Sequence, residues 1–529
     1  MRPTLPITSV LLGFAILVGH AGCLTTSTNS GSGWGADGSP GSAAELPPPR
    51  PDSGAPGSPA KPPGESWGAE RLQARPDSGA LEPDAAPSTC VGLDPSSPAV
   101  LYLSSDDSNS MASPAIVRHF IESRGGLVNP AEVRTYEFLN YYNVRYQVAE
   151  AGTLRIVPQL RRLGTSGDVE LQIGVQAPAP AATRPPLTLT LVLDTSGSMN
   201  GTPISLLSRS IKALATRLRA GDIVSAVTWS TSQTVPMSGH VVTGPNDPAV
   251  LALADGMRAN GGTDLSAGLQ RGYALARQHQ GQGRINRVML ISDGGANVGV
   301  TDEKLIGDAA DVQNKEGIYL VGVGVGEGLN DVLMNVVTDA GNGAYVYLDT
   351  PQEADKMLGS RFDEVLGVAA RHVEVKLTLP WYFKMLEFHG EEYSTEPAKV
   401  KPQDLAPGDA MVFHQTLRAC EATRIEDADA IAVQATWKDP LTFLPNTAQV
   451  SQTMSELLAG QDAELRRGRA IVAYAEALKA VGRTGSRAER AALLDKAAAV
   501  VDEADPGRND PELGEIRGLI ARYKSQVAQ

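Results

Sequence analysis

The side chains best suited to chemistry lie in three short polar stretches of this 529-residue chain. Two of the stretches follow apolar runs, and the third is a glycine-rich loop at 260–264. Their oxygen-bearing side chains are Asp194, Ser196, Ser198, Thr263 and Asp293. Carboxylate and hydroxyl oxygens are the donors that hard divalent cations take in proteins. The stretches therefore predict a metal site, and the alternative for each is a polar turn that only joins a strand to a helix.

The elements around these stretches predict that the three meet. Runs of aliphatic residues, typical of strands buried on both faces, cover residues 187–193, 223–229, 287–291, 318–323 and 345–348. Segments with helical spacing of apolar residues alternate with them at 203–219, 249–257, 265–278, 302–314 and 329–338. This alternation predicts an α/β fold with a doubly wound parallel sheet, in which ligands bind at the carboxyl ends of the strands. All three polar stretches fall at that edge.

The order Asp-x-Ser-x-Ser, then threonine, then aspartate after a strand resembles the metal-ion-dependent adhesion site (MIDAS) of von Willebrand factor A (vWA) domains. The resemblance implies that Ser196, Ser198 and Thr263 contact the metal, and that Asp194 and Asp293 hold it largely through water. Magnesium is the expected ion, with Mn²⁺ or Ca²⁺ as alternatives, because all the donors are oxygens.

Further stretches resemble a bacterial subgroup of vWA lipoproteins. The matching residues are 104–107, 116–118, 133–141, 292–300, 329–334 and 341–345. Gly295 and Ala296 replace an acidic and an aromatic residue that are usual in that subgroup. The five candidate ligands are all intact, so the resemblance still implies a complete metal site.

The first residues, 1–23, are typical of an export signal. Arg2 supplies positive charge, residues 10–18 form an apolar core too short to span a membrane comfortably, and small residues precede Cys23. This arrangement resembles a bacterial lipobox, which implies a lipid anchor on Cys23. We therefore expect a lipoprotein of the bacterial cell envelope, at the outer membrane or the periplasmic face. His20 departs from the aliphatic residue usual at its position, so ordinary secretion is the alternative.

The remaining chain divides into segments of distinct composition. Residues 24–97 are rich in Gly, Pro and Ser, which predicts a disordered linker. We expect an N-terminal helical segment at 98–150, strands at 151–180, a vWA domain at 186–362, a β-sandwich at 366–440 and a helical segment at 451–529. The strands of 151–180 are expected to pair with those of 366–440, so that the vWA domain interrupts one sandwich. Tyr141, Tyr142 and Tyr146 suit packing against a neighbouring domain or stacking on carbohydrate.

Cys90 and Cys420 are left once Cys23 carries lipid. In an oxidising compartment they could form a disulfide. Two free thiols are the alternative, because the sequence does not reveal the distance between them.

Composition and motifs limit the other functions. A net charge of −14 argues against nonspecific nucleic-acid binding. The seven histidines are scattered without zinc-ligand spacing, and no nucleotide-binding or hydrolase motif lies at a strand-to-helix turn. Ser196 has no base nearby in the sequence, so we expect no enzyme. The predicted function is metal-dependent capture of a partner's Asp or Glu carboxylate, the alternatives being a structural lipoprotein with a stabilising metal and a metal-dependent hydrolase.

Overall fold

The computed structural model describes residues 90, 92–106, 109–295 and 317–527. All of them belong to one compact unit, Leu72–Gln529. The predicted export signal, its Cys23, nearly all of the predicted linker and the predicted helix at 302–314 lie outside the described residues.

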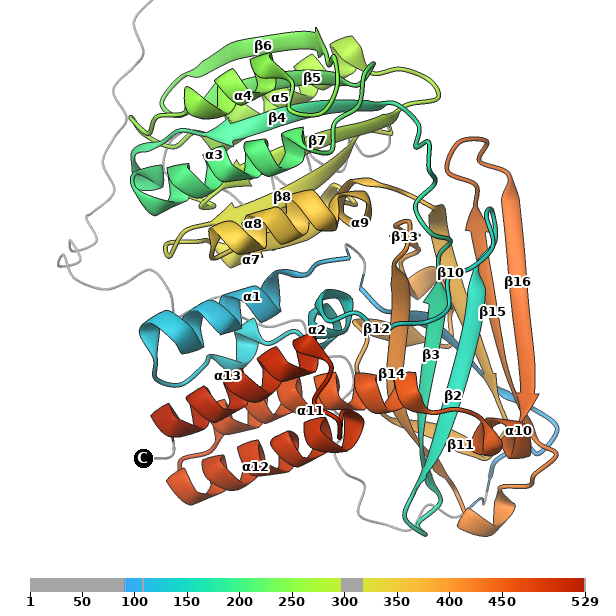
Figure 1. Ribbon diagram of the computed structural model, residues 1–529. Coiled ribbons are helices and arrows are strands. Elements are labelled where there is room, and N and C mark those ends of the chain that lie inside the picture. The colour runs from blue at the N-terminus through green and yellow to red at the C-terminus, as the bar shows by residue number, and fades with distance from the viewer. Residues whose placement is uncertain (1–89, 91, 107–108, 296–316, 528–529) are drawn as a thin grey trace, which may run out of the picture. The chain divides into compact units, whose positions relative to one another are not determined.

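A six-stranded sheet is organised around β4 (Leu187–Asp194), whose apolar sequence leaves all eight residues buried. A strand buried on both faces needs helices on both sides of its sheet. β4 pairs in parallel with β5 (Ile223–Trp229) and β7 (Ile285–Ser292). Strands β8 (Tyr319–Val325) and β9 (Tyr345–Leu348) continue the parallel order (Figure 1). The doubly wound α/β arrangement expected from the sequence is therefore present.

The edge strand β6 (Gln233–Val241) was not expected from the sequence. It pairs antiparallel with β5, and its residues are half-buried or exposed. Pro236 lies within it, as edge strands allow because one side of their backbone needs no hydrogen-bonded partner. A half-exposed strand carries no long apolar run, which is the signal that identifies the buried strands.

Helices connect the strands of this sheet or, in the case of the last two, follow its final strand β9 and lead to the rest of the chain. They are α3 (Thr202–Ala215), α4 (Pro248–Asp255), α5 (Leu265–His279), α7 (Asp331–Ala340), α8 (Pro351–Asp355) and α9 (Phe362–Leu366). Helix α5 approaches β4 closely at Gly272, where a β-carbon would lie 2.3 Å from Cγ2 of Val192. Gly322 of β8 gives similar room to Thr338 of α7. Glycine at these two contacts therefore sets how near the helices lie to the sheet.

Two antiparallel sheets form a β-sandwich with a shared core. One has the order β12-β1-β10-β15-β16, with β13 beside β10, and the other has the order β11-β14-β3-β2. The strands of the first are β1 (Ala99–Ser104), β10 (Ala370–Leu379), β12 (Glu392–Ser394), β13 (Gln403–Leu405), β15 (Ala430–Lys438) and β16 (Pro445–Thr453). Those of the second are β2 (Arg155–Leu163), β3 (Asp168–Gln176), β11 (Phe383–Phe388) and β14 (Ala410–Ala419).

Strands from before and after the α/β region share the second sheet. β3 pairs antiparallel with β14, from Asp168 opposite Arg418 to Gln176 opposite Ala410. Two segment limits differ from expectation. The first residues of the segment expected to be helical, 98–150, form β1, because Leu101 and Leu103 alternate into the sandwich core. Likewise, residues 451–453 extend β16 and are not helical.

The N-terminal helices α1 (Ala112–His119) and α2 (Thr135–Tyr141) pack with helices from the end of the chain. The latter are α11 (Ala463–Arg483), α12 (Arg487–Ala504) and α13 (Pro511–Val527). Helix α10 (Met454–Ala459) packs instead on the β-sandwich, whose core contains its Met454 and Leu457. Phe138 of α2 lies against Tyr474 of α11, with ring centroids 5.6 Å apart. Tyr141, Tyr142 and Tyr146 are buried, so they serve packing and not carbohydrate stacking. No helix within the described ranges is long and apolar enough to cross a bilayer.

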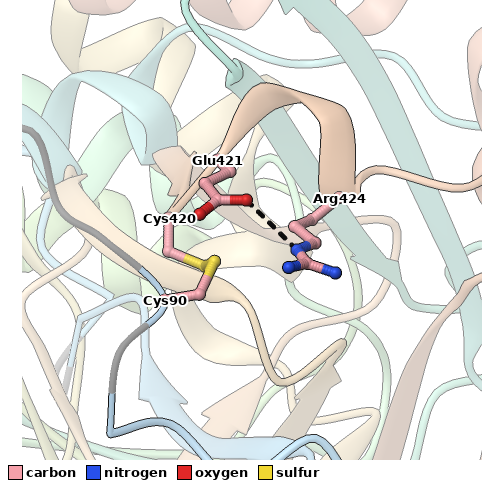
Figure 2. The surroundings of a disulfide bond; sticks show 4 residues. All are labelled: Cys90, Cys420, Glu421 and Arg424. Carbon is pink, nitrogen blue, oxygen red and sulfur yellow. Dashed lines mark hydrogen bonds and ion pairs between the residues drawn. A yellow bond between two sulfur atoms is a disulfide. The ribbon is translucent and has the colours of Figure 1, made fainter.

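A disulfide joins Cys90 to Cys420, directly after β14 (Figure 2). The two residues are 330 positions apart, and their Cα atoms are 5.1 Å apart. The bond fastens the beginning of the described chain to the sandwich. Disulfides persist mainly in oxidising compartments such as the periplasm and the cell exterior.

Candidate metal centre

The carboxyl end of β4 carries three of the predicted ligands. Asp194, the last residue of the strand, is fully buried. Its Oδ1 accepts the amide N–H of Ser196 at 2.9 Å, which turns the chain back over the strand end. A 3₁₀ turn, Gly197–Met199, follows and brings Oγ of Ser198 to 3.0 Å from Oγ of Ser196. Two hydroxyls and one carboxylate therefore cluster at the tip of the central strand.

The loop that carries Thr263 is fastened to this turn by the backbone. Gly197 donates to the carbonyl of Gly261 at 2.9 Å, and Asn260 donates to the carbonyl of Thr195 at 2.7 Å. Thr263 is 2% exposed. Asp264 then caps α5 by accepting the amide of Ala267 at 3.0 Å. These hydrogen bonds place the threonine beside the two serines.

The third segment follows β7, which lies next to β4 in the sheet. Asp293 is 5% exposed, and its Oδ1 accepts the amide of Gly295 at 3.1 Å. Ser292, to which the sequence assigned no role, donates its hydroxyl to Oδ2 of Asp194 at 2.6 Å. The parallel pairing of β4 with β7 therefore brings the polar stretch after β7 next to the polar stretch at the end of β4.

Side chains from all three predicted stretches lie around Gly295. A β-carbon placed on this glycine would lie 3.2 Å from Oδ1 of Asp293, 3.6 Å from Cγ2 of Thr263 and 4.0 Å from Oγ of Ser198. Oγ of Ser196 lies 3.0 Å from Oγ of Ser198, and the amide of Ser196 donates to Oδ1 of Asp194 at 2.9 Å. All five residues predicted from the sequence are therefore brought together by the fold, and the side-chain-free Gly295 leaves the space between them open.

Negative charge accumulates at this point. Burial raises the pKa of Asp194 to about 6, and the charge of Asp293 adds to the rise. Hydrogen bonds from Ser292 and Ser196 oppose it only in part. Within the described ranges no three His, Cys, Asp or Glu side chains lie together as a metal-binding group. The candidate donors are three hydroxyls and two carboxylates.

Residues 188–359 match the family model of the von Willebrand factor type A domain. The chain contains a vWA domain. This domain comprises the parallel sheet and its helices, and the match confirms the fold class expected from the sequence.

Sequence similarity to two curated proteins extends beyond the vWA domain. The chain is 30% identical over 283 residues to the uncharacterized protein YfbK of Escherichia coli (strain K12), covering 50% of this chain and 47% of that protein. It is 26% identical over 211 residues to the uncharacterized protein sll0103 of Synechocystis, covering 40% of this chain and 49% of that protein. The chain thus spans about half the length of these curated relatives.

Among solved structures, the von Willebrand factor type A protein of Catenulispora acidiphila is similar to this chain. The two are 13% identical, with a TM-score of 0.44, and the match covers 71% of this chain and 92% of that one.

The candidate metal centre borders a cleft of about 610 Å³ that the sequence did not reveal. Ser198, Thr263 and Asp293 line it on the side of the vWA domain, together with Tyr347 of β9. His119, at the end of helix α1, lines it as well. A segment that precedes the vWA domain by many residues therefore contributes to the surroundings of its candidate site.

Buried ion pairs hold α1 in this position. Arg118 donates to both carboxylate oxygens of Asp349, at 2.7 and 2.9 Å, and to Glu353 at 2.9 Å. Arg361 of the vWA region donates to the backbone carbonyls of Tyr141 at 2.8 Å and Asn140 at 3.1 Å. Buried charges of this kind are costly to break, because the partner left behind stays buried without a counter-charge. These contacts, among them the ion pair with Asp349 at the wall of the cleft, therefore fix the position of His119.

Proposed function

We propose that this chain is a divalent-metal-dependent protein-binding protein of the bacterial cell envelope, whose metal captures an acidic side chain of a partner. The observation that carries the proposal is that Ser198, Thr263 and Asp293, from three separate segments, meet at the carboxyl edge of the sheet and line one open cleft. In this assignment the metal ligands are Asp194, Ser196, Ser198, Thr263 and Asp293. The vWA domain supports the assignment, because the order of these residues resembles that of a MIDAS motif.

The donor set fits a small, hard cation. Hydroxyl and carboxylate oxygens suit Mg²⁺, and also Mn²⁺ or Ca²⁺. The charge of Asp293 helps raise the pKa of Asp194, and the largest contributions to that rise include no cation. A bound Mg²⁺ would supply the missing positive charge and a coordination position for a carboxylate oxygen of the partner.

Each residue has a definable task in holding that ion. Asp194 orients the turn through the amide of Ser196, while Ser292 donates to its other oxygen. By the resemblance to MIDAS sites, the hydroxyls of Ser196, Ser198 and Thr263 bind directly and the two carboxylates bind through water. Neutral inner ligands leave most of the cation's charge uncompensated, which favours an anionic partner group.

The cleft favours binding over catalysis. Its volume, about 610 Å³, accommodates a partner's side chain together with neighbouring backbone. Ser196, the conceivable nucleophile, is fully buried, and its described contacts are Ser198 and Asp194. An activated serine needs a base that removes its proton. We therefore propose no catalytic step.

The envelope location rests on the disulfide and on the predicted export signal. The Cys90–Cys420 bond suits an oxidising compartment. We propose that Cys23 carries the lipid anchor that tethers the chain to the membrane, with ordinary secretion as the alternative. Acyl labelling of the chain, compared with a Cys23→Ser variant, tests the anchor separately from the metal site.

Crosslinking from isolated membranes tests the partner. We expect a protein to be captured with Mg²⁺, and capture to be lost in EDTA and in Ser198→Ala, whereas Ser525→Ala on the exposed face of α13 should change nothing. Capture that survives both EDTA and Ser198→Ala would overturn the proposal.

Melting temperatures separate the proposal from a purely structural metal. Mg²⁺ could raise the Tm of the wild type but not of Ser198→Ala, while partner capture depended neither on Mg²⁺ nor on Ser198. In that case the metal would only stabilise the edge of the sheet. Metal-dependent turnover in a hydrolase screen, lost in Ser196→Ala, would favour an enzyme instead.

A further inference from the structure

The tip of the β15–β16 hairpin exposes a cluster of large apolar side chains. Leu441 is 53% exposed, Phe443 57% and Leu444 63%. The other exposed large apolar residues of the described chain lie far from one another in sequence. Single exposed apolar side chains are ordinary, whereas three within four residues mark an interaction surface. We call residues 439–444 the apolar tip.

The backbone donors of the apolar tip are satisfied within the tip itself. Oδ1 of Asp439 accepts the amides of Leu441 at 3.0 Å and Thr442 at 2.7 Å, and the hydroxyl of Thr442 at 2.8 Å. Phe443 donates to the carbonyl of Asp439 at 3.0 Å, and Leu444 donates to Oγ1 of Thr442 at 3.4 Å. Asp439 donates in turn to the carbonyl of Leu444 at 2.9 Å.

Prolines complete this pattern. Pro440 within the tip and Pro445 after it have no amide N–H to satisfy. Every backbone N–H of 439–444 is therefore paired. A segment with paired donors can leave water at a much lower cost than an ordinary loop, because an unpaired N–H in an apolar medium is expensive.

Contacts with the underlying Arg371 also fix the conformation of the apolar tip. Nε of Arg371 donates to the carbonyl of Pro440 at 3.2 Å, and its guanidinium lies over the rings of Tyr319 and Phe443, at 4.6 and 5.5 Å from their centroids. Phe443 has a φ of 58°, a conformation that costs energy for a bulky residue. The surrounding contacts thus hold the aromatic side chain outward in spite of that cost.

We propose that the apolar tip inserts into the interface of a lipid bilayer. Three observations favour a lipid surface over a protein groove. The side chains project from a hairpin end and do not line a hollow, and the tip offers a protein partner no free backbone donor. Lys438 is exposed at the base of the tip, so a cationic group stands where anionic headgroups would lie. Arg371, opposite it in the strand register, is only 9% exposed and lies 3.7 Å from Asp404, so it supports the tip and does not face the headgroups.

Asp439, the acidic residue of the tip, turns its carboxylate oxygen toward the amides of the turn. Membrane insertion by the tip is independent of the metal centre and of a lipid anchor on Cys23. It would orient the sandwich, whose β15–β16 hairpin is seen at the right of Figure 1.

Vesicle flotation of the full chain carrying Cys23→Ser tests the proposal without any attached acyl chain. The probes are vesicles of phosphatidylcholine, alone or with phosphatidylglycerol. Combined replacement Leu441→Ser, Phe443→Asn and Leu444→Ser should lower partitioning about tenfold or more, since it removes most of the insertable apolar area. The control is Val241→Ser on β6, which replaces an apolar side chain of similar exposure (59%). It should leave partitioning unchanged.

Two further variants test the mechanism. With Phe443→Trp, vesicles containing brominated lipid should quench the new tryptophan. Asp439→Ala keeps the apolar side chains but leaves the amides of Leu441 and Thr442 unpaired, so it should weaken partitioning, whereas Asp439→Asn keeps an acceptor and should preserve it. Equal partitioning of the triple variant and its parent, or an unquenched tryptophan in vesicle-bound protein, would overturn the proposal.

Discussion

Replacing Asp194 by asparagine should stabilise the metal-free protein at neutral pH, although it should also abolish stabilisation by metal. Burial and the nearby charge of Asp293 raise the pKa of Asp194 to about 6. Asparagine has almost the same shape without the charge. Its Oδ1 can accept the Ser196 amide as before, and its Nδ2 can donate to the Ser292 hydroxyl, which rotates to accept.

The size of the effect follows from the pKa shift. A rise from 3.8 to about 6 corresponds to about 3 kcal/mol of unfavourable ionisation in the folded state. Between these two values the folded state still holds a proton that the unfolded state has lost. The free energy of unfolding of the metal-free protein therefore falls as the pH rises from about 4 to about 6, and stays reduced above that. The asparagine variant should lack this dependence.

Urea unfolding in EDTA at about pH 4 and about pH 8 measures the difference. We expect the variant to match the wild type at the lower pH and to exceed it by up to about 3 kcal/mol at the higher pH. Mg²⁺ should raise the Tm of the wild type alone. Asp427→Asn, at an exposed carboxylate, controls for the lost charge. A variant less stable than the wild type at pH 8, or a gain equal at both pH values, would refute the reasoning.

Three other outcomes rest on contacts already described. Gly295→Ala should weaken Mn²⁺ binding in calorimetric titration about tenfold or more without changing the Tm in EDTA, because its β-carbon enters the space between the donors. Gly272→Ala should cost about 1–3 kcal/mol in urea unfolding through its clash with Val192, whereas Gly514→Ala, with open space around it, should be neutral or stabilising. Removing the disulfide by Cys90→Ser and Cys420→Ser should lower the Tm as reduction of the wild type does, and it should lower the free energy of unfolding by at most about 6 kcal/mol, because the bond closes a loop of 330 residues. An unchanged Tm would show that the bond contributes nothing.

The buried parts of the fold could be predicted from the sequence. Strands β5 and β9 begin and end where their apolar runs do, since a strand covered on both faces needs an uninterrupted run. β16 could not be found in this way. Its sequence, PNTAQVSQT, is polar, and it is a strand because β15 pairs with it along its whole length. Pairing with a neighbour, unlike burial, leaves little trace in the sequence.

The same contrast holds at the candidate site. The five candidate donors were predicted because each lies shortly after a buried run or in a glycine-rich loop before a helix, and their role as metal ligands stays a prediction. The hydrogen bond from Ser292 to Asp194 could not, because it depends on the register between β4 and β7. Nor could the place of His119 beside the cleft, which depends on the ion pairs of Arg118. The sequence could not decide between a disulfide and two free thiols, because distance along the chain says nothing about distance in space.

Strand β3 is synthesised long before the strand that completes its sheet. It ends at Gln176, while β14 begins only at Ala410, and the whole vWA region is made between them. Until β14 emerges, the β2–β3 hairpin presents an unpaired edge, which is the kind of surface at which chains aggregate. Cys90 can form its disulfide only after Cys420 has also been synthesised. A nascent chain arrested before residue 410 therefore lacks the strand that covers this edge, and such an intermediate is prone to associate with its neighbours.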